Sequence, residues 1–381
     1  MEHFISKVRI EKLRHLENLE IELSADERRH LLLTGKNGSG KTSLLESLSN
    51  CLRAAVMKVN PRKIFDSEKF LRGVADGGVE VSFNLVDDLK KVFAEGKFIS
   101  AYFPASRKAK ILLAKGVEDI KFADSYDIST DPAENLVKYM VHLKTQQAYA
   151  RQANDTKVEI EIQNWFDRFE NALGDLLEDK TLRLDYDYKN YNFLIHQDGR
   201  LPFGFNELSD GYSSVIQIIS GIMLRMEQNW LLKGALSEYN FEGVVLIDEL
   251  ETHLHIELQR KILPFLIDFF PRVQFIISTH SPYILTSVSK ATIFDLEKKV
   301  IFNDLSDYSI GNIAEAYFDS EDYSVRLEKK LAEYKTLLEK NNPTDEERIR
   351  RSDLRQEFKK LNGELSPRIK EAFEEIESRR K

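Results

Sequence analysis

"RRHLLLTGKNGSGKTSLLESLSNCLRAAV", residues 28–56, is the stretch of sequence that decides the fold. An apolar run leads into a glycine-rich loop, and the residues after the loop carry apolar side chains at helical spacing. The loop, residues 35–42, matches the GxxxxGK[ST] pattern in the strand, loop and helix context that this pattern requires. The stretch therefore predicts a phosphate-binding loop in an α/β fold.

Each residue type in this loop suits a phosphate ligand. Glycines let backbone N–H groups turn inward around a β-phosphate, and the following helix adds its positive end. Lys41 would supply a mobile charge for the β- and γ-phosphates, and the Thr42 hydroxyl would ligate Mg²⁺. ATP and Mg²⁺ are the expected cofactors; the alternative is a glycine-rich turn without a ligand. The expected nucleotide-binding residues of this segment are Gly35, Lys36, Asn37, Gly38, Ser39, Gly40, Lys41, Thr42 and Ser43.

A second signal is the apolar strand in "FEGVVLIDELETHLH", residues 241–255, which ends in two acids. A strand inside a parallel sheet delivers its last side chains to the carboxyl edge, where ligands bind in open α/β folds. We expect Asp248 to bind Mg²⁺ directly or through water, and Glu249 to orient and deprotonate the attacking water. The pair predicts hydrolysis. By itself, such a pair more often ends a strand at the solvent boundary.

A third apolar strand, "VQFIIST" at residues 273–279, is followed by His280. The imidazole would lie at the same sheet edge, where it could donate to the γ-phosphate or position the water. We therefore assign His280 a catalytic role, although a lone histidine after a strand is more often structural.

The segment "LSDGYSS", residues 208–214, predicts a helix start that could form a second anion cradle. Ser209, Gly211 and the N-terminus of a helix beginning near Ser213 would contribute to it. A single phosphate loop leaves the far side of a γ-phosphate uncovered, so this cradle would complete the site of another copy in a head-to-tail dimer. The alternative is a capped helix start, with Ser209 or Asp210 satisfying free N–H groups.

The order of these motifs, phosphate loop, "LSDGY", "LIDE" and "STHSP", resembles the ABC-type ATPase heads of the SMC and RecF group. That resemblance makes residues 208–212 the signature motif, with Ser209, Asp210 and Gly211 as nucleotide-binding residues of the opposite protomer, and it implies a homodimer or higher multimer. The motif departs from the common signature: Asp210 stands where glycine is usual, and Tyr212 where glutamine is usual. An acid beside phosphate is repulsive unless it points away.

Two other segments allow more than one role. In "FISAYFPASRKAK", residues 98–110, Arg107 could sense nucleotide, face a partner or belong to a solvated basic loop. Thr252, His253 and His255 match the family's segment that crosses the dimer interface. The two histidines are two residues apart and do not share a helix face, so interface packing is favoured over a metal site.

Composition bounds the setting of this chemistry. The chain has 381 residues, 42% of them hydrophobic, and a net charge of −8. No apolar run approaches the ~18 residues of a membrane helix, and a single cysteine fits a reducing compartment, so a cytoplasmic location without a membrane partner is expected. The negative charge argues against a generally basic nucleic-acid coat, but a local basic strip would still allow DNA or RNA binding.

The expected fold is α/β: an ABC-type P-loop ATPase head with a mixed β-sheet, an antiparallel β subdomain, a compact helical lobe and a C-terminal helical extension. We place an N-terminal ATPase lobe at residues 1–110, a helical insertion lobe at 111–180, a C-terminal ATPase lobe at 181–302 and the extension at 303–381. No heptad pattern runs far enough for long coiled-coil arms.

The extension begins with a closing hairpin in "ATIFDLEKKVIFNDLSDYS", followed by charged helices. An apolar stripe, a capping box at "TDEE" and a Ser-Pro helix start each support one helix. The stripe residues are Leu327, Leu331, Tyr334 and Leu338, and the two helix starts are Thr344 and Ser366. Partner docking and a solvated face are equally favoured for it. It is too short and too rich in lysine and glutamate for an appended nuclease domain, so we expect no nuclease activity from this chain alone.

The wording "IDELETHLH", "LPFL", "FPRVQFIISTHSPYIL" and "YSIGNIAEAYF" is similar to the ATPase subunits, the PtuA family, of Septu-type anti-phage systems, also found with retrons. This resemblance implies an ATPase that multimerises and regulates an HNH-type nuclease partner. Two alternatives remain: a RecF-like DNA-repair ATPase that clamps DNA, and a slow nucleotide-gated scaffold that inhibits its partner. The stoichiometry, the trigger and the direction of ATP control are not encoded in these motifs.

Overall fold

The computed structural model describes residues 2–56, 70–72, 78–85, 89, 92, 97–107, 110–118, 127–233, 241–302, 304–305, 325–340, 343–360 and 367–378. The chain forms two compact units, residues 1–307 and 308–381. We describe each unit by itself.

A six-stranded sheet forms the centre of the first unit. Its order is β13-β12-β3-β11-β10-β6, and all neighbours are parallel except β12 and β13. Every residue of β3, β10, β11 and β12 is buried, as expected for parallel strands covered on both faces. The strands are β3 (His30–Thr34), β6 (Phe98–Phe103), β10 (Glu242–Ile247), β11 (Val273–Ser278), β12 (Ala291–Asp295) and β13 (Val300–Phe302).

A second, antiparallel sheet has the order β2-β1-β5-β4. Strand β1 mixes buried with exposed positions, because one of its faces packs on the core. The strands are β1 (Ile5–Leu13), β2 (Leu16–Glu22), β4 (Phe70–Arg72) and β5 (Val79–Phe83).

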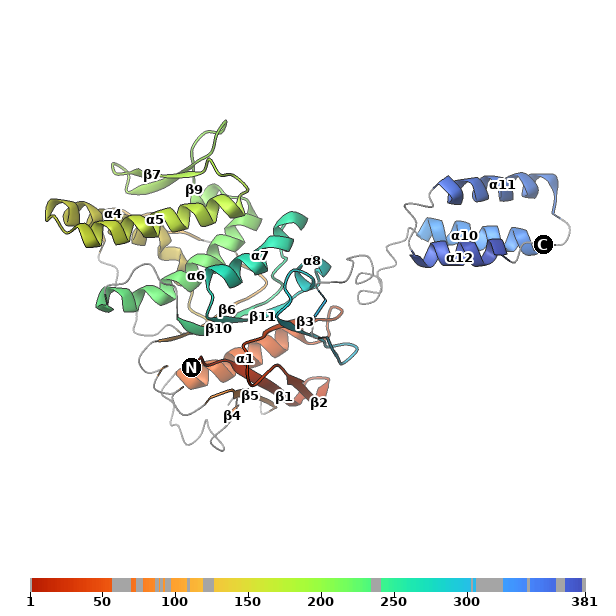
Figure 1. The fold of residues 1–381 in the computed structure, drawn as a ribbon, viewed down its shortest axis with the longest axis horizontal. Coiled ribbons are helices and arrows are strands. Elements are labelled where there is room, and N and C mark those ends of the chain that lie inside the picture. Colours follow the sequence, from red (N-terminus) through yellow and green to blue (C-terminus); the bar gives the residue numbers. More distant parts are fainter. Residues whose placement is uncertain are drawn as a thin grey trace. The chain divides into compact units, whose positions relative to one another are not determined.

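Helix α1 (Lys41–Val56) lies between the two sheets, in contact with β4 and β5 on one side and β6, β10 and β11 on the other (Figure 1). Its leucines, spaced three and four residues apart, face both sheets and form one buried cluster with their strands. The leucines of this cluster on α1 are Leu44, Leu45, Leu48 and Leu52. Packing on both sides fixes where the helix begins, and with it the loop before it.

The opposite face of the six-stranded sheet is covered by α6 (Asp210–Lys233) and α7 (Ile256–Phe269) (Figure 1). The short α8 (Pro282–Leu285) follows β11 and contacts α7. Helix α6 contacts β6, so the helix that begins at the predicted signature packs on the sheet that carries the acid pair.

A helical lobe stands beyond α6. Its helices are η1 (Pro132–Asn135), α4 (Leu136–Gln152) and α5 (Thr156–Leu176). An antiparallel sheet follows, with strands β7 (Arg183–Asp187), β8 (Asn192–His196) and β9 (Phe203–Gly204), and then η2 (Phe205–Glu207). Aromatic rings fill its interior, and the buried Trp165 donates Nε1–H to Glu227 Oε1 of α6 at 3.1 Å. This bond joins the lobe to the helix of the predicted signature.

The second unit contains α10 (Val325–Glu339), α11 (Asp345–Lys360) and α12 (Pro367–Ser378) around Tyr334, Phe358 and Phe373. The predicted capping box is confirmed: Thr344 N donates to Glu347 Oε2 at 2.9 Å, and Glu347 N donates to Thr344 Oγ1 at 3.3 Å. Leu331 and Leu338 of the predicted stripe pack on this core. The side chain of Leu327, the cap Ser366 and the segment "YSIGNIAEAYF" lie outside the described residues.

The predicted α/β class is confirmed, with a mixed sheet, an antiparallel subdomain, a helical lobe and C-terminal helices. The hairpin of β12 and β13 is also confirmed. Within the described ranges of the chain, none of the helices combines the length and apolar character needed to cross a bilayer.

Candidate active site

The phosphate loop joins the end of β3 to α1. Gly35, Gly38 and Gly40 all have positive φ values, of 125°, 83° and 99°, which residues other than glycine rarely adopt. Space is also tight, because a Cβ on Gly35 or Gly40 would lie 3.0 Å from Ser39 Oγ or Leu16 Cδ1, respectively. The glycines therefore set the loop's backbone, as the pattern predicts.

Lys41 folds back over this loop. Its Nζ donates to Gly35 O at 2.7 Å and to Lys36 O at 3.1 Å, and the residue is only 6% exposed. Burial lowers the Lys41 pKa, and the carboxylates of Glu249, Glu251, Asp248 and Asp295 oppose that shift. The ammonium is thus held at the loop, facing the acids that follow β10.

Thr42 and Asp248 meet at the carboxyl edge of the sheet. Thr42 Oγ1 donates to Asp248 Oδ2 at 2.8 Å, and Ser278 Oγ donates to Asp248 Oδ1 at 2.5 Å. One hydroxyl and one carboxylate oxygen suit Mg²⁺, which prefers oxygen ligands and takes few from the protein. Thr42 and Asp248 therefore fit the Mg²⁺ that the sequence predicts, as residues that could hold it.

Glu249 has an unusual backbone for a residue other than glycine, with a φ of 46°. Its N–H donates to Ser278 Oγ at 2.7 Å, and Thr252 Oγ1 donates to its Oε2 at 3.2 Å. The half-buried Glu249 carboxylate lies close enough to the Lys41 ammonium to oppose the lowering of the Lys41 pKa by burial. Such a carboxylate can orient water and accept its proton.

His280 follows β11 at the same edge. Its backbone N–H donates to Glu251 Oε1, and its buried Nε2 has no hydrogen-bond partner among the described residues. Burial lowers the His280 pKa and Lys41 lowers it further, so the imidazole is neutral near pH 7. A neutral imidazole with an unsatisfied buried nitrogen can exchange a hydrogen bond with a polar ligand.

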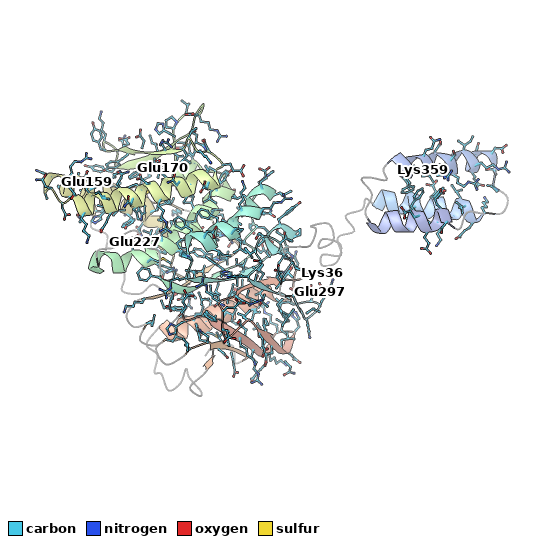
Figure 2. All side chains as sticks on the ribbon, viewed as in Figure 1. Lys36, Glu159, Glu170, Glu227, Glu297 and Lys359 are labelled. Carbon is cyan, nitrogen blue, oxygen red and sulfur yellow. The ribbon has the colours of Figure 1, made fainter. Side chains whose placement is uncertain are left out.

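The rim of the loop is polar. Lys36 Nζ lies 3.2 Å from Glu297 Oε1 across the turn after β12, and the two side chains lie side by side in Figure 2. Asn37 and Gly38 are exposed, whereas Ser39 is buried and its Oγ has no partner among the described residues. Ser43 is buried on α1, at 7% exposure.

Sequence reasoning missed three contributors to this edge. Ser278 bridges Asp248 and Glu249; Glu251 holds the His280 backbone; and His15 Nε2 contacts Ser39 O at 3.1 Å from the turn between β1 and β2. Burial raises the Glu251 pKa, and the nearby Glu249 also raises it. Ser278 and Glu251 lie in the quoted motifs. Their contacts form because β10 and β11 are neighbours in the sheet, and the sequence alone does not specify that pairing.

The signature segment differs from expectation in one respect. Helix α6 begins at Asp210, not near Ser213, because Ser213 N already donates to Ser209 O at 2.8 Å. Ser209 and Asp210 are exposed, and an acid in the first turn suits the positive helix end. Gly211 is buried against the turn after the acid pair, where an added Cβ would lie 2.5 Å from His253 O.

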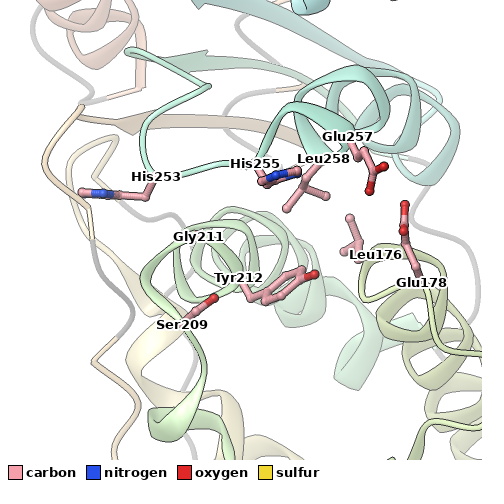
Figure 3. A pocket seen from close by; sticks show the side chains of 9 residues that line it. All are labelled: Leu176, Glu178, Ser209, Gly211, Tyr212, His253, His255, Glu257 and Leu258. Atoms are coloured by element: carbon pink, nitrogen blue, oxygen red, sulfur yellow. The ribbon is translucent and has the colours of Figure 1, made fainter.

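Ser209, Gly211 and Tyr212 line a cavity of about 160 Å³ with His253 and other residues. Figure 3 shows it between the start of α6, the start of α7 and the end of α5. None of its described lining residues belongs to the phosphate loop. The remaining lining residues are Leu176, Glu178, His255, Glu257 and Leu258.

Bonds and charge interactions thus connect the phosphate loop, Asp248, Glu249 and His280 at one sheet edge, whereas the signature opens into a separate cavity. Arg107 is 5% exposed, so the alternative of a solvated basic loop is wrong. Among the described residues, no cluster of three or more histidine, cysteine, aspartate or glutamate side chains could hold a metal ion.

Comparisons with known proteins agree with this site. Residues 31–286, more than half of the chain, match the family model described as "AAA domain, putative AbiEii toxin, Type IV TA system". The chain is 23% identical to the Septu protein PtuA of Bacillus mycoides (strain KBAB4), a match that covers 74% of this chain and 38% of that protein. It thus spans well under half of that relative's length.

Two further similarities were found. The chain is 23% identical to the "Retron Vc95 probable ATPase" of Vibrio cholerae serotype O1 biovar El Tor, over 72% of this chain and 70% of that protein. An SMC head solved bound to the C-winged helix domain of ScpA aligns with a TM-score of 0.42 and 10% identity, covering 78% of this chain and 96% of that one.

The family model covers the phosphate loop, the acid pair and His280, the residues that the structure brings to one sheet edge. The chain is homologous to PtuA of Septu systems, and it belongs to the AAA-domain family described as "putative AbiEii toxin, Type IV TA system".

Proposed function

We propose that two copies of this ATPase enclose ATP between them, with the phosphate loop of one copy facing Ser209 and Gly211 of the other. The observation that carries the proposal is the separation of the two halves. Residues 35–42 contact the acid pair within one chain, whereas Ser209 is exposed next to the start of the 24-residue helix α6 and lines a cavity to which no described phosphate-loop residue contributes. A second anion cradle that faces outward suits a ligand presented by another molecule.

Within each copy the residues divide the chemistry. Lys41 places positive charge at the β- and γ-phosphates, and Glu249 orients water and accepts its proton. His280, neutral near pH 7, would hydrogen-bond the γ-phosphate or that water through Nε2. Bound through Thr42 and Asp248, Mg²⁺ would neutralise charge that develops on the phosphates.

We propose further that ATP turnover regulates a partner effector in cytoplasmic anti-phage defence, with an HNH-type nuclease as the partner. The homology to a Septu protein and the similarity to a retron ATPase support this setting. The second unit, 308–381, folds around its own core and would serve as the docking or assembly element.

Mixing two inactive variants tests the split site. Lys41→Ala would disable one copy's phosphate loop, and Ser209→Arg would block the cradle that the other copy needs. Each variant alone should be inactive, whereas an equal mixture should recover about a quarter of wild-type ATPase activity, because half of the dimers are mixed and each has one intact site.

Recovery should appear only when subunits can exchange. A parallel measurement follows the mass of Glu249→Gln by light scattering with ATP and Mg²⁺, where the dimer should form and persist. No recovery in the mixture, together with a Glu249→Gln chain that stays monomeric with ATP bound, would refute the shared site.

A further inference from the structure

Arg107 uses all of its hydrogen-bonding capacity in the interior of the first unit. Its five N–H groups make five bonds: Nε to Ser214 Oγ (2.7 Å), one terminal nitrogen to Pro104 O (3.1 Å) and Asp248 O (2.5 Å), and the other to Glu249 O (2.9 Å) and Leu250 O (3.1 Å). The residue is 5% exposed. A guanidinium is a rigid, planar fork, so these bonds fix the relative positions of everything they reach.

Three of the acceptors are the successive carbonyls of residues 248–250, the turn that carries the catalytic acid. Glu249 has a φ of 46° there, a conformation that is unfavourable for residues other than glycine and persists only where the surroundings impose it. Ser278 Oγ accepts the Glu249 N–H from one side, and Arg107 binds the Glu249 carbonyl from the other. The Thr252 N–H also donates to the Glu249 carbonyl, at 3.0 Å, so the guanidinium is one of three partners that hold this backbone.

Of the two other donors, Nε connects this turn to helix α6. Ser214 lies on α6, is 1% exposed, and follows Ser209 by little more than one helical turn. If the start of α6 moves, Ser214 moves with it. Because Ser214 binds Arg107 Nε, the guanidinium would transmit this movement to the carbonyls of residues 248–250. Within the described part of the chain, the Arg107 guanidinium links Ser214, near the start of α6, to the Glu249 carbonyl through its own hydrogen bonds.

A buried charge is an unfavourable way to fill space in the interior, because the ion loses its hydration. Burial lowers the Arg107 pKa to about 10, opposed by Glu251, Asp248 and Glu249, so the guanidinium stays charged at neutral pH. An apolar side chain of similar volume would fill the space without the desolvation cost of an ion. What the arginine adds is geometry.

We propose that Arg107 is a positioning residue that sets the Glu249 carboxylate according to the position of α6. It makes the catalytic acid of one copy responsive to whatever occupies that same copy's signature cradle. The part of the inference that involves the cradle rests on the proposed shared site. The contact between Arg107 and the Glu249 turn does not.

Two variants separate these parts. Arg107→Lys keeps a positive charge but loses the fork, and Ser214→Ala removes only the acceptor of Nε while leaving the carbonyl clamp. We expect kcat for ATP to fall about tenfold or more in Arg107→Lys and about threefold to tenfold in Ser214→Ala, with ATP affinity within about twofold of wild type, because the loss lies in orientation of the acid.

Arg225→Lys is the matched control. Arg225 is also buried on α6, at 6% exposure, and its guanidinium binds the backbone carbonyls of Asp127, Ile128 and Thr130, away from the acid turn. The same substitution there should lower the melting temperature but leave kcat unchanged. A merely structural Arg107 would behave like Arg225.

A double-mutant cycle then locates the effect. In a Glu249→Gln background, Arg107→Lys should cause no further loss from the residual rate, since the group it positions is already disabled. A wild-type kcat in Arg107→Lys, an equal fold-loss in the Glu249→Gln background, or a kcat loss matched by Arg225→Lys would each overturn the proposal. If the mixing experiment above fails but this cycle holds, only the link to the cradle is lost.

Discussion

At the scale of single residues, strain and chemistry coincide at Glu249. Its left-handed backbone is fixed by a serine from β11 and an arginine from the turn after β6. The motif "LIDEL" predicts the acid and its role, but it contains no sign of that conformation. Ser278 and Arg107 are distant from residue 249 in the chain, so only the folded sheet brings them to it.

The contacts of Arg107 show why the sequence alone is compatible with several roles for this residue. A short "SRKAK" segment reads as solvated because its neighbours are basic. Burial of one arginine in it depends on five acceptors, four of which lie more than a hundred residues away in the chain. By contrast, the phosphate-loop residues were predictable, since their function depends on local backbone geometry.

A prediction at this scale concerns His30 on β3. Its Nδ1 accepts the Phe275 N–H at 3.1 Å, and burial, with Arg28 nearby, lowers its pKa from 6.5 to about 3. As pH falls below 6.5, the unfolded chain takes up this proton before the folded one. The stability from neutral His30 is thus complete above pH 6.5 and is lost towards pH 3, by up to about 1.4 kcal/mol per pH unit.

Urea unfolding at pH 7.5, 6.5 and 5.5 measures this dependence. His30→Asn retains an acceptor but does not titrate, so its unfolding free energy should fall less steeply below pH 6.5. His142→Asn, at a half-buried position on α4, is the matched histidine substitution away from β3. Equal slopes for His30→Asn and wild type would contradict the prediction.

At the scale of elements, strand order is the main thing that the motifs could not predict. Three apolar strands with polar ends were expected to share an edge, and they do. Strand β11 lies between β3 and β10, so Ser278 lies at the end of, and His280 just after, the strand between the one that precedes the phosphate loop and the one that precedes the acid turn. Alternating and apolar runs identify strands, but their neighbours are chosen by long-range packing against α1 on one face and α6 and α7 on the other.

The capping box of α11 allows an element-scale prediction. Thr344→Ala removes the side-chain acceptor of Glu347 N, and a lost cap of this kind costs about 0.5–2 kcal/mol. We expect faster amide hydrogen exchange in the first turns of α11, residues 345–352, with exchange in the first unit unchanged.

Thr336→Ala provides the matched substitution. This exposed threonine lies inside α10, where its Oγ1 donates to Ala332 O, and alanine is the better helix former at such a position. It should leave exchange in α11 unaffected. Equal exchange in Thr344→Ala and wild type would show that the box does not stabilise α11.

At the scale of the whole molecule, the chain consists of two units with separate cores. The site contacts described above all lie within residues 1–307, and the three C-terminal helices have a core of their own. The sequence motifs predicted this outline because each is local to one unit. Assembly and partner choice depend on surfaces between molecules, and no local pattern encodes them.

A chain ending at residue 307 should therefore bind ATP as the full chain does. We expect a dissociation constant within about twofold by calorimetry, because no described site residue is removed. Lys41→Ala in the same shortened chain should abolish binding. A folded 1–307 chain that has lost ATP affinity would show that residues beyond 307 contribute to the site.

The central position of β3 has a consequence for biosynthesis. In the described sheet this strand pairs only with β11 and β12. During synthesis, β3 therefore has no partner strand until residues 273–295 have been made, and the phosphate loop that follows it is not held in place. At ordinary translation speeds of about 5–20 residues per second, that delay is roughly ten to fifty seconds. A ribosome-bound chain would be unable to capture nucleotide during this interval, and its exposed apolar strand would be a natural client for chaperones.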